Sequence, residues 1–322
     1  MSKQNPKVSI VMVNYNGLNY LKRTIPRILD LDYPNYEFIV VDNGSSDGSI
    51  EFLKNKKEVR LIQSPRVSEK NYACNYAIKR AKGDYILLLD NDILINEMSI
   101  LNNLLNGARS LNDFGAYSLA FFNEGMKKTK NYGVYLGYYY VKETRYLEFN
   151  RVKKMHNSEI SSLHGIGIFI EKDMWEKLRG YEENLKFGGD DIDLGLRISL
   201  HGFKNYLYSK SLQKHIGLPE RTDNLKYELK LKKNIYGNLY TITKNYSILN
   251  LYPTLIFYTI FAFFKSIKQS INRSNYGSVM SFFKGYYLFL KNIKSVLKRR
   301  KDIQSNRFSR RDVFLNVKPR II

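Results

Sequence analysis

Two aspartates interrupt an apolar stretch of the sequence, ILLLDNDILI at positions 86–95. An unpaired carboxylate is costly to bury, so Asp90 and Asp92 must either leave the core at the end of a strand or meet a positive partner. Carboxylates at this spacing can share a hard divalent ion, because Mg²⁺ and Mn²⁺ prefer oxygen ligands. A solvated turn is the alternative interpretation of so short a pattern.

A second acidic group, Asp190 and Asp191, follows two glycines and opens a stretch with helical apolar spacing. Acids at a helix N-terminus can cap free backbone N–H groups and interact favourably with the helix dipole. Alternatively, neighbouring carboxylates raise each other's pKa, which makes one of them suitable as a general base. Asp193 has the spacing to pair with Arg197 four residues later. The residues alone leave these interpretations open.

Two further polar groups have the chemistry for binding. His215 is one of four histidines and is either a structural residue or a transition-metal ligand; with the carboxylates it would suit Mn²⁺ as well as Mg²⁺. The stretch DNGSSDGS at 42–49 has neither the P-loop nor the dinucleotide glycine pattern. Asp42, at its start, could still contact a ribose or a base edge.

Short apolar runs alternate with helix-compatible segments through the first 90 residues. This alternation is typical of βαβ units and predicts an α/β fold, with a mostly parallel sheet flanked by helices. In such sheets ligands bind beyond the carboxyl ends of the strands. Three predicted strands are KVSIVMVNYN, YEFIVVD and DYILLLDND. They end in polar pairs, which are Asn14 and Asn16, Asp42 and Asn43, and Asp90 and Asp92. We therefore expect these side chains at one edge of the sheet.

The whole set of stretches points to a known family. In order, the chain carries VSIVMVNYNGLNYL, YEFIVVDNGSSDGS, AKGDYILLLDND, FGGDDIDLGLRISLHGF and the following His215. Over about residues 7–217 it resembles family 2 glycosyltransferases with the Rossmann-like GT-A fold. It looks most like the subgroup that contains rhamnosyl- and galactofuranosyltransferases. The resemblance implies a dTDP-, UDP- or GDP-sugar donor, a divalent metal (Mn²⁺ or Mg²⁺) and inversion at the anomeric carbon.

The resemblance also implies roles for particular residues. In the D-x-D motif, Asp92 is the main carboxylate on the metal, Asp90 contacts ribose or metal, and Asn91 contacts the nucleotide-sugar. Asp191 matches the catalytic base and His215 a metal ligand. The remaining matches are Asn14, Asp42 and Asn75 for nucleotide-sugar binding, with Asp190, Asp193 and Arg197 in support.

Two stretches depart from the family pattern. Asp190 stands where the family usually has Glu, which shortens that side chain by one methylene. The third strand usually leads into an Asn-x-Gly loop, whereas this chain reads SPRVSEKNYACN. We therefore expect this wall of the donor site to differ from that of the relatives.

Basic residues concentrate at the C-terminal end of the chain. Residues 265–322 hold fifteen Lys and Arg against two acids, in a protein with a net charge of +22. We divide the chain into a catalytic domain, 1–220, and a helical extension, 221–322. Within the extension, 245–264 carries no charge, and 276–300 predicts one basic amphipathic helix with lysines on one face and aromatic and aliphatic residues on the other. Such a helix is typical of proteins that lie on an anionic membrane surface.

Localisation and partners follow from these patterns. The single cysteine, Cys74, fits a reducing compartment, and we expect a cytoplasmic enzyme on the inner face of the membrane, with a glycan or lipid-linked acceptor. A short membrane-embedded segment at 245–264 and packing of the tail against the catalytic domain are the alternatives there. A nucleic-acid-binding protein, a nucleotidyltransferase and an inactive scaffold are the other functions considered. Because no nucleic-acid recognition motif is present, we expect no nucleic-acid partner.

Overall fold

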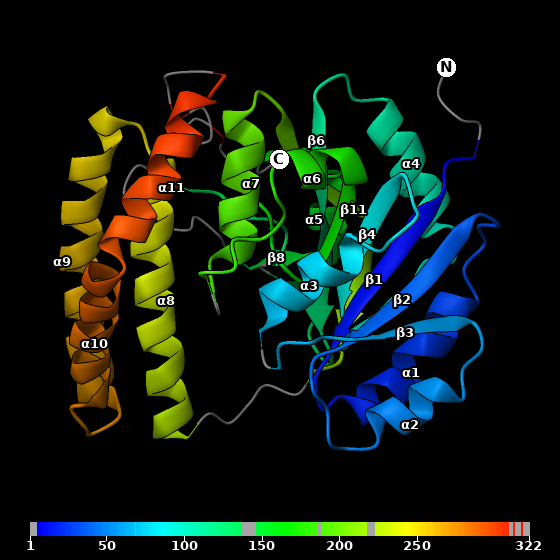
Figure 1. Ribbon diagram of the computed structural model, residues 1–322, viewed down its shortest axis with the longest axis horizontal. Coiled ribbons are helices and arrows are strands. Elements are labelled where there is room, and N and C mark those ends of the chain that lie inside the picture. The colour runs from blue at the N-terminus through cyan, green and yellow to red at the C-terminus, as the bar shows by residue number, and fades with distance from the viewer. Residues whose placement is uncertain are drawn as a thin grey trace.

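The computed structural model describes residues 5–67, 69–129, 131–136, 146–185, 188–217, 223–308, 312 and 317. Its strands are β1 (Val8–Asn14), β2 (Tyr36–Asp42), β3 (Val59–Gln63), β4 (Tyr85–Asp90), β5 (Ile93–Leu94), β6 (Phe114–Asn123), β7 (Lys128–Thr129), β8 (Leu147–Glu148), β9 (Glu159–Ile160), β10 (Gly167–Glu171) and β11 (Lys204–His215). Nine of them form one sheet in the order β3-β2-β1-β4-β10-β6-β11-β5, with β9 beside β11, while β7 and β8 pair separately (Figure 1).

The sheet is parallel where the sequence shows strand–helix alternation. β1 pairs in parallel with β2 and β4, and β2 with β3. Beyond β4 the sheet becomes mixed, because β10 runs antiparallel between β4 and β6, and β6 then pairs in parallel with β11. The α/β architecture expected from the sequence is therefore present, with a reversed strand in the middle of the sheet.

Helices cover both faces of the sheet. They are α1 (Leu18–Leu29), α2 (Ser49–Lys54), α3 (Lys70–Ile78), α4 (Ile100–Arg109), α5 (Phe149–Lys154), α6 (Lys172–Lys177) and α7 (Asp190–Leu200). Successive side chains of a strand point to opposite faces, and β1 follows this rule. Ile10 and Met12 enter a core with α1 and α4, whereas Val11 and Val13 enter a core with α3, α6 and α7.

Four further helices form a bundle beside the sheet domain: α8 (Asn224–Asn245), α9 (Ile248–Asn272), α10 (Gly277–Lys291) and α11 (Ile293–Ser305). Figure 1 shows α7 between the sheet and this bundle. The sequence of α7 explains its position, because apolar residues surround it. Leu194 and Ile198 pack into the sheet core, and Ile192, Leu196 and Leu200 pack into the core of the bundle.

The single amphipathic helix predicted for 276–300 is wrong, because the helix breaks at Asn292. The Asn292 side chain donates a hydrogen bond to the Leu288 carbonyl at 2.8 Å, a local bond that competes with helix continuation. The predicted apolar face also divides: Phe282 and Phe289 are buried in the bundle, whereas Phe283 is 53% exposed. The predicted domain boundary at 220/221 lies outside the described residues.

Helix α9 presents an apolar surface to solvent. Within the described ranges it is the one helix long and apolar enough to cross a membrane, and 22% of its most apolar window is buried. Large exposed side chains line it: Leu249, Tyr252, Ile256, Phe257, Ile260, Phe261, Phe264 and Ile271. These residues together are called the α9 apolar face below. A soluble monomer rarely leaves so many large apolar side chains in water.

Candidate functional site

Polar side chains at the ends of β1 and β2 form one hydrogen-bonded network with the turn after β4. Asn14, fully buried, donates from Nδ2 to Asp42 Oδ2 at 3.0 Å and to Ser45 Oγ at 3.1 Å, and its Oδ1 accepts from Asn91 Nδ2 at 2.7 Å. Asp42 Oδ1 accepts from the backbone N–H of Ser45 at 2.9 Å. Gly17 closes over the network, since a Cβ there would collide with Asn91 and Asn14. The sheet edge predicted from the sequence thus brings Asn14, Asp42 and Asn91 together.

Asp90, the last residue of β4, meets a positive partner. Lys70, the first residue of α3, places its Nζ 2.7 Å from Asp90 Oδ1. Burial would lower the pKa of Lys70, but the Asp90 and Asp190 carboxylates outweigh it and raise that pKa well above its ordinary value. Lys70 therefore stays protonated. The pair explains how the apolar strand tolerates an acid at its end.

Asp92 lies beside His215, with Asp92 Oδ2 and His215 Nε2 3.0 Å apart. His215 reaches this place because it ends β11, where it is the antiparallel partner of Ile93 in β5. Its other ring nitrogen, Nδ1, lies 3.1 Å from Asn123 Oδ1, a carbonyl oxygen that can only accept. The hydrogen bond to Asp92 raises the pKa of His215, against burial, which lowers it. Asn123 thus holds the ring with Nδ1–H donated and Nε2 directed at the carboxylate.

These two residues fit a divalent ion. Asp92 Oδ1 is a buried oxygen with no hydrogen-bond partner, and Gly217 leaves room around the pair, since a Cβ there would collide with Asp92 Oδ2 and lie 2.9 Å from His215 Nε2. A ligating histidine commonly donates its second N–H to a fixed acceptor, as His215 does to Asn123. No group of three or more His, Cys, Asp or Glu among the described residues is placed to hold a metal. Further ligands would come from substrate phosphates and water, which is usual for Mg²⁺.

Asp190 and Asp191 form the first turn of α7. Two glycines precede them with φ of 83° and 87°, a left-handed conformation that favours glycine. Gly189 is the N-cap, and no side chain caps the helix, so the aspartates do not act as its N-cap. Burial first, and then the charge of Asp191, raise the pKa of Asp190 to about 7. One carboxyl of the pair can therefore hold or release a proton near neutral pH.

Asp191 connects to the β4 edge through the segment before β10. Asp191 Oδ2 accepts from the backbone N–H of Gly165 at 2.7 Å, and the next residue, Ile166, accepts the backbone N–H of Asp90 at 3.2 Å. A Cβ at Gly165 would lie 3.1 Å from Asp191 Oδ2. The two acidic groups, 100 residues apart in sequence, are therefore neighbours at one edge of the sheet.

The other predicted support residues anchor α7. Asp193 is fully buried and accepts from Arg197 Nε at 2.9 Å, which is the i,i+4 pair expected from the sequence. It also accepts from Lys244 Nζ and, at 2.8 Å, from Asn245 Nδ2, both on α8. Burial would raise the pKa of Asp193, but the charges of Lys244 and Arg197 lower it below its ordinary value. Asp193 and Arg197 thus join α7 to the C-terminal bundle.

The side-chain amide of Asn75 forms hydrogen bonds to the loop after α6 through both its nitrogen and its oxygen. Its Nδ2 donates to the Tyr181 carbonyl at 2.9 Å, and its Oδ1 accepts from the Tyr181 N–H at 2.9 Å. A third contact runs from Nδ2 to Glu183 at 3.2 Å. The structure thus gives Asn75 a role in holding this loop, and the predicted contact to the nucleotide-sugar stays a prediction.

Sequence reasoning missed three contributors to the site. Lys70 and Asn123 lie far in sequence from their partners, and no spacing links either of them to a carboxylate. Gly165 contributes a backbone N–H group. Every residue except proline has this group, so the residue type gives no signal. The small residues in SLHGIGIF were the one available signal, because they let a carboxylate approach the backbone closely.

Comparisons with known proteins agree with this geometry. The family model "Glycosyl transferase family 2" matches residues 9–163. The matched range includes Asn14, Asp42 and both aspartates of the D-x-D motif, Asp90 and Asp92. The matched residues, just under half of the chain, are similar to this family. Because the match ends before α7, it says nothing of Asp190, Asp191 or His215.

Curated relatives are similar over part of their length. The chain is 32% identical over 96 residues to the putative teichuronic acid biosynthesis glycosyltransferase TuaG of Bacillus subtilis, covering 29% of this chain and 38% of the relative. It is 30% identical over 228 residues to an uncharacterized glycosyltransferase of Rickettsia typhi, covering 65% of each. The chain thus spans less than two thirds of either relative.

One solved structure illustrates the shared fold. The mannosyltransferase PcManGT from Pyrobaculum calidifontis, in complex with GDP-Man and Mn²⁺, aligns over 97% of this chain and 86% of its own, with a TM-score of 0.56 and 16% identity. At this identity the likeness concerns the fold alone. The fold is therefore the α/β GT-A type that the sequence led us to expect, with a helical C-terminal region added.

Proposed function

We propose that this chain is an inverting, metal-dependent glycosyltransferase that transfers a sugar from a nucleoside-diphosphate donor to a hydroxyl group of a glycan or a lipid-linked acceptor. The observation that carries the proposal is the meeting of Asp90, Asp92, His215 and the first turn of α7 at one sheet edge, with a buried Asp92 oxygen left without a partner. The similarity of residues 9–163 to glycosyl transferase family 2 supports the reaction class.

The donor nucleoside binds over the ends of β1 and β2. Asn14 and Asp42 are held rigid by each other and by Ser45, so their polar edges are pre-organised for a base and a ribose. Asn91 and Asp90 continue this surface towards the diphosphate, where Lys70 supplies a fixed positive charge. GDP-sugars, UDP-sugars and dTDP-sugars are the donor classes; within the family, the rhamnosyl- and galactofuranosyltransferase subgroup remains our prediction.

The metal would be held by Asp92 and His215, with Asp90 near enough in sequence to add a contact. A divalent ion bound there would neutralise the charge that develops on the leaving diphosphate. Because His215 donates Nδ1–H to Asn123, a divalent ion at Nε2 would take the place of the proton that bonds Asp92 in the metal-free protein. Asp92 offers the partnerless Oδ1 in addition to the oxygen that faces His215.

Asp191 is proposed as the general base. Its carboxylate is oriented by the Gly165 N–H, so it can receive a proton from an acceptor hydroxyl at a fixed position. The acceptor oxygen forms a bond to the anomeric carbon from one face while the bond to the diphosphate oxygen breaks on the other, and the proton ends on Asp191. Asp190, whose pKa is raised to about 7, supports this role by keeping a second carboxyl partly protonated.

A binding and transfer experiment tests the proposal. Calorimetric titration with GDP-, UDP- and dTDP-sugars, each with and without Mn²⁺, should find one donor that binds in a metal-dependent manner. Asp92→Ala should weaken that binding, whereas Asp191→Asn should keep it and lose transfer. The matched variant Asp190→Asn, which removes the neighbouring carboxylate, should retain measurable transfer. Transfer by Asp191→Asn at the wild-type rate would contradict the assignment of the base.

For the acceptor, we propose a membrane-bound substrate. The α9 apolar face is the supporting observation, together with exposed cations next to it, Lys265 and Lys268 on α9 and Lys284 on α10. Partial insertion of such a surface, with lysines at the anionic headgroups, would hold the enzyme on the cytoplasmic leaflet. The similarity to the teichuronic acid protein supports a role in surface polysaccharide assembly.

Vesicle sedimentation tests this part separately. The wild-type chain should bind phosphatidylglycerol-containing vesicles, and Ile256→Glu/Phe261→Glu should bind far less. The control Lys57→Gln/Lys79→Gln lowers the net charge by two, as the test variant does, at exposed sites on the sheet domain. Equal loss in both double variants would refute insertion of the α9 apolar face.

A further inference from the structure

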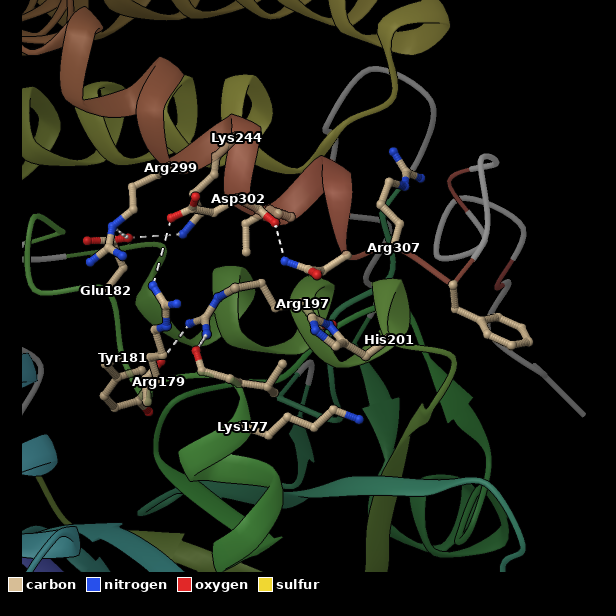
Figure 2. A pocket seen from close by; sticks show the side chains of 15 residues that line it. Lys177, Arg179, Tyr181, Glu182, Arg197, His201, Lys244, Arg299, Asp302 and Arg307 are labelled. Carbon is tan, nitrogen blue, oxygen red and sulfur yellow. Dashed lines mark hydrogen bonds and ion pairs between the residues drawn. The ribbon is translucent and has the colours of Figure 1, made fainter.

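A cavity of about 500 Å³ lies between the sheet domain and α11. It is separate from the acidic cluster, because none of Asp90, Asp92, Asp191 and His215 lines it. Figure 2 shows its walls: α6 and the following loop on one side, α7 as the floor, and α11 as the opposite wall. This volume lies in the range of small-molecule sites.

Basic side chains dominate the lining. Six of them surround the cavity: Lys177, Arg179, Arg197, Lys244, Arg299 and Arg307. Four carboxylates face them, two in the lining and two directly behind it: Glu182, Asp302, Asp193 and Asp312. Six cations against four carboxylates leave a net charge of +2. His201 adds no charge, because burial lowers its pKa.

The buried part of this charge is internally paired and gives the cavity a rigid floor. Arg197 and Lys244 share Asp193, and both side chains are at least nine-tenths buried. Arg197 also donates to the Leu178 carbonyl at 2.6 Å and to the Gly180 carbonyl at 2.8 Å. These bonds fix the loop that carries Arg179, so the cavity wall is pre-organised.

The excess charge belongs to the side chains that reach into the opening. Arg299 Nε lies 3.4 Å from Glu182 Oε2, an oxygen that also lies 3.4 Å from Lys244 Nζ, so one carboxylate is divided between two cations. Arg179 is 73% exposed and lies 3.8 Å from Asp302 Oδ2, which is a weak pair. Among the described residues no carboxylate pairs with Lys177, whose Nζ lies 5.6 Å from the centre of the Phe203 ring.

The two guanidinium groups are placed to act together. Arg299 and Asp302 are three residues apart on α11, so they share one face of that helix. Since Arg179 meets Asp302 and Arg299 meets Glu182 on the facing loop, both arginines line the same seam between the loop and α11 (Figure 2). Planar guanidinium groups form paired hydrogen bonds with phosphate oxygens.

We propose that this cavity is a binding site for a phosphate-bearing anion, held by Arg179 and Arg299, at the junction of the sheet domain and the C-terminal bundle. The charge fits: a doubly charged phosphate or diphosphate would balance the net +2. The ligand is either a lipid phosphate headgroup or a free phosphate compound. An exposed aromatic side chain, Phe308, which is 81% exposed at the rim, gives a lipid-borne phosphate an apolar contact. The site does not depend on the proposed transfer reaction.

Inorganic pyrophosphate is the first probe, titrated into the full chain by calorimetry with EDTA present. EDTA excludes metal-dependent binding at the acidic cluster, so failure of the proposed function leaves this test unaffected. The double variant Arg179→Gln/Arg299→Gln removes two charge-assisted donors, each worth about tenfold in affinity, and should bind about a hundredfold more weakly. The matched control Lys57→Gln/Lys298→Gln removes one charge from the sheet domain and one from the exposed side of α11.

Vesicles of phosphatidylcholine with and without phosphatidic acid form the second arm. Saturable pyrophosphate binding that is lost in the arginine variant and kept in the control identifies a free phosphate compound as sufficient. If pyrophosphate does not bind, but the arginine variant loses binding to phosphatidic acid vesicles and the control keeps it, the ligand is a lipid headgroup. If the two double variants behave alike in both arms, the attraction is diffuse surface charge and the proposed site does not exist.

Discussion

Asp190→Asn gives the sharpest test of the electrostatics at the start of α7. The ordinary pKa of this carboxyl is 3.8, and in the folded protein burial and then Asp191 raise it to about 7. Between these values the folded state keeps a proton that the unfolded state has lost. The free energy of unfolding of the wild-type protein must therefore fall as the pH rises from about 4 to about 7. Above pH 7 both states are ionised and the loss is complete.

The size of the effect follows from the same shift. Three pKa units correspond to about 4 kcal/mol, at about 1.4 kcal/mol for each pH unit in the window. Asparagine has a similar shape and cannot ionise, so Asp190→Asn escapes this loss. The variant and wild type should have similar stability near pH 4, and the variant should be more stable by on the order of 4 kcal/mol above pH 7.

Urea unfolding, followed by the fluorescence of Trp175 in metal-free buffer, measures this difference. Trp175 is the single tryptophan and is buried in the core on which α7 packs, so its signal reports on the relevant part of the fold. Asp193→Asn is the internal control, and its stability should change in the opposite direction. The charges of Lys244 and Arg197 lower the pKa of Asp193 in the folded state, although burial alone would raise it. That variant should be less stable than wild type at neutral pH.

A stability gain in Asp190→Asn that stays constant from about pH 4 to about pH 8 would show that the carboxyl titrates alike in both states. The raised pKa at the α7 N-terminus would then be refuted. The idea that this pair holds a proton near neutral pH would be refuted with it.

Three further outcomes are expected. Lys70→Met should lower kcat/KM for transfer by about 10- to 100-fold, because it removes a charge-assisted hydrogen bond and leaves Asp90 unpaired; unchanged kinetics would contradict the role of this pair. Asn123→Leu should weaken Mn²⁺ binding by about 10- to 100-fold in a calorimetric titration, since it frees the His215 ring; equal affinity would show that the ring orientation is set elsewhere. Lys244→Met should lower the free energy of unfolding by about 3–5 kcal/mol in urea, because it strips a cation from two buried carboxylates; a loss below about 1 kcal/mol would show that this cluster is not energetically coupled.

The sheet edge was predictable because topology alone places it. Strands of one parallel βαβ series all point their carboxyl ends the same way, so Asn14, Asp42 and Asp90 had to lie at the same edge of the sheet wherever the exact register fell. The reversal of β10 was not predictable, because a short buried strand has the same apolar composition in either direction. Yet this strand places the Gly165–Ile166 segment between Asp191 and Asp90.

The tail shows where pattern reasoning reached its limit. A helical wheel separates apolar from charged residues, but it cannot say whether the apolar side faces lipid or protein. In α10 both occur, since Phe282 is buried in the bundle while Phe283 is half exposed. The break at Asn292 depends on one side-chain hydrogen bond. The spacing of hydrophobic residues in the sequence cannot reveal such a bond.

The position of α7 has a practical consequence for any attempt to divide the chain. Removal of residues after about 220 would expose Ile192, Leu196 and Leu200 to water, and it would leave the buried Asp193 without Lys244. The sheet domain is therefore not a module that can be produced by itself. A truncated product would be expected to aggregate or to lose its catalytic turn, and its inactivity would carry no information about chemistry. Functional dissection of this protein has to proceed by point substitution in the intact chain.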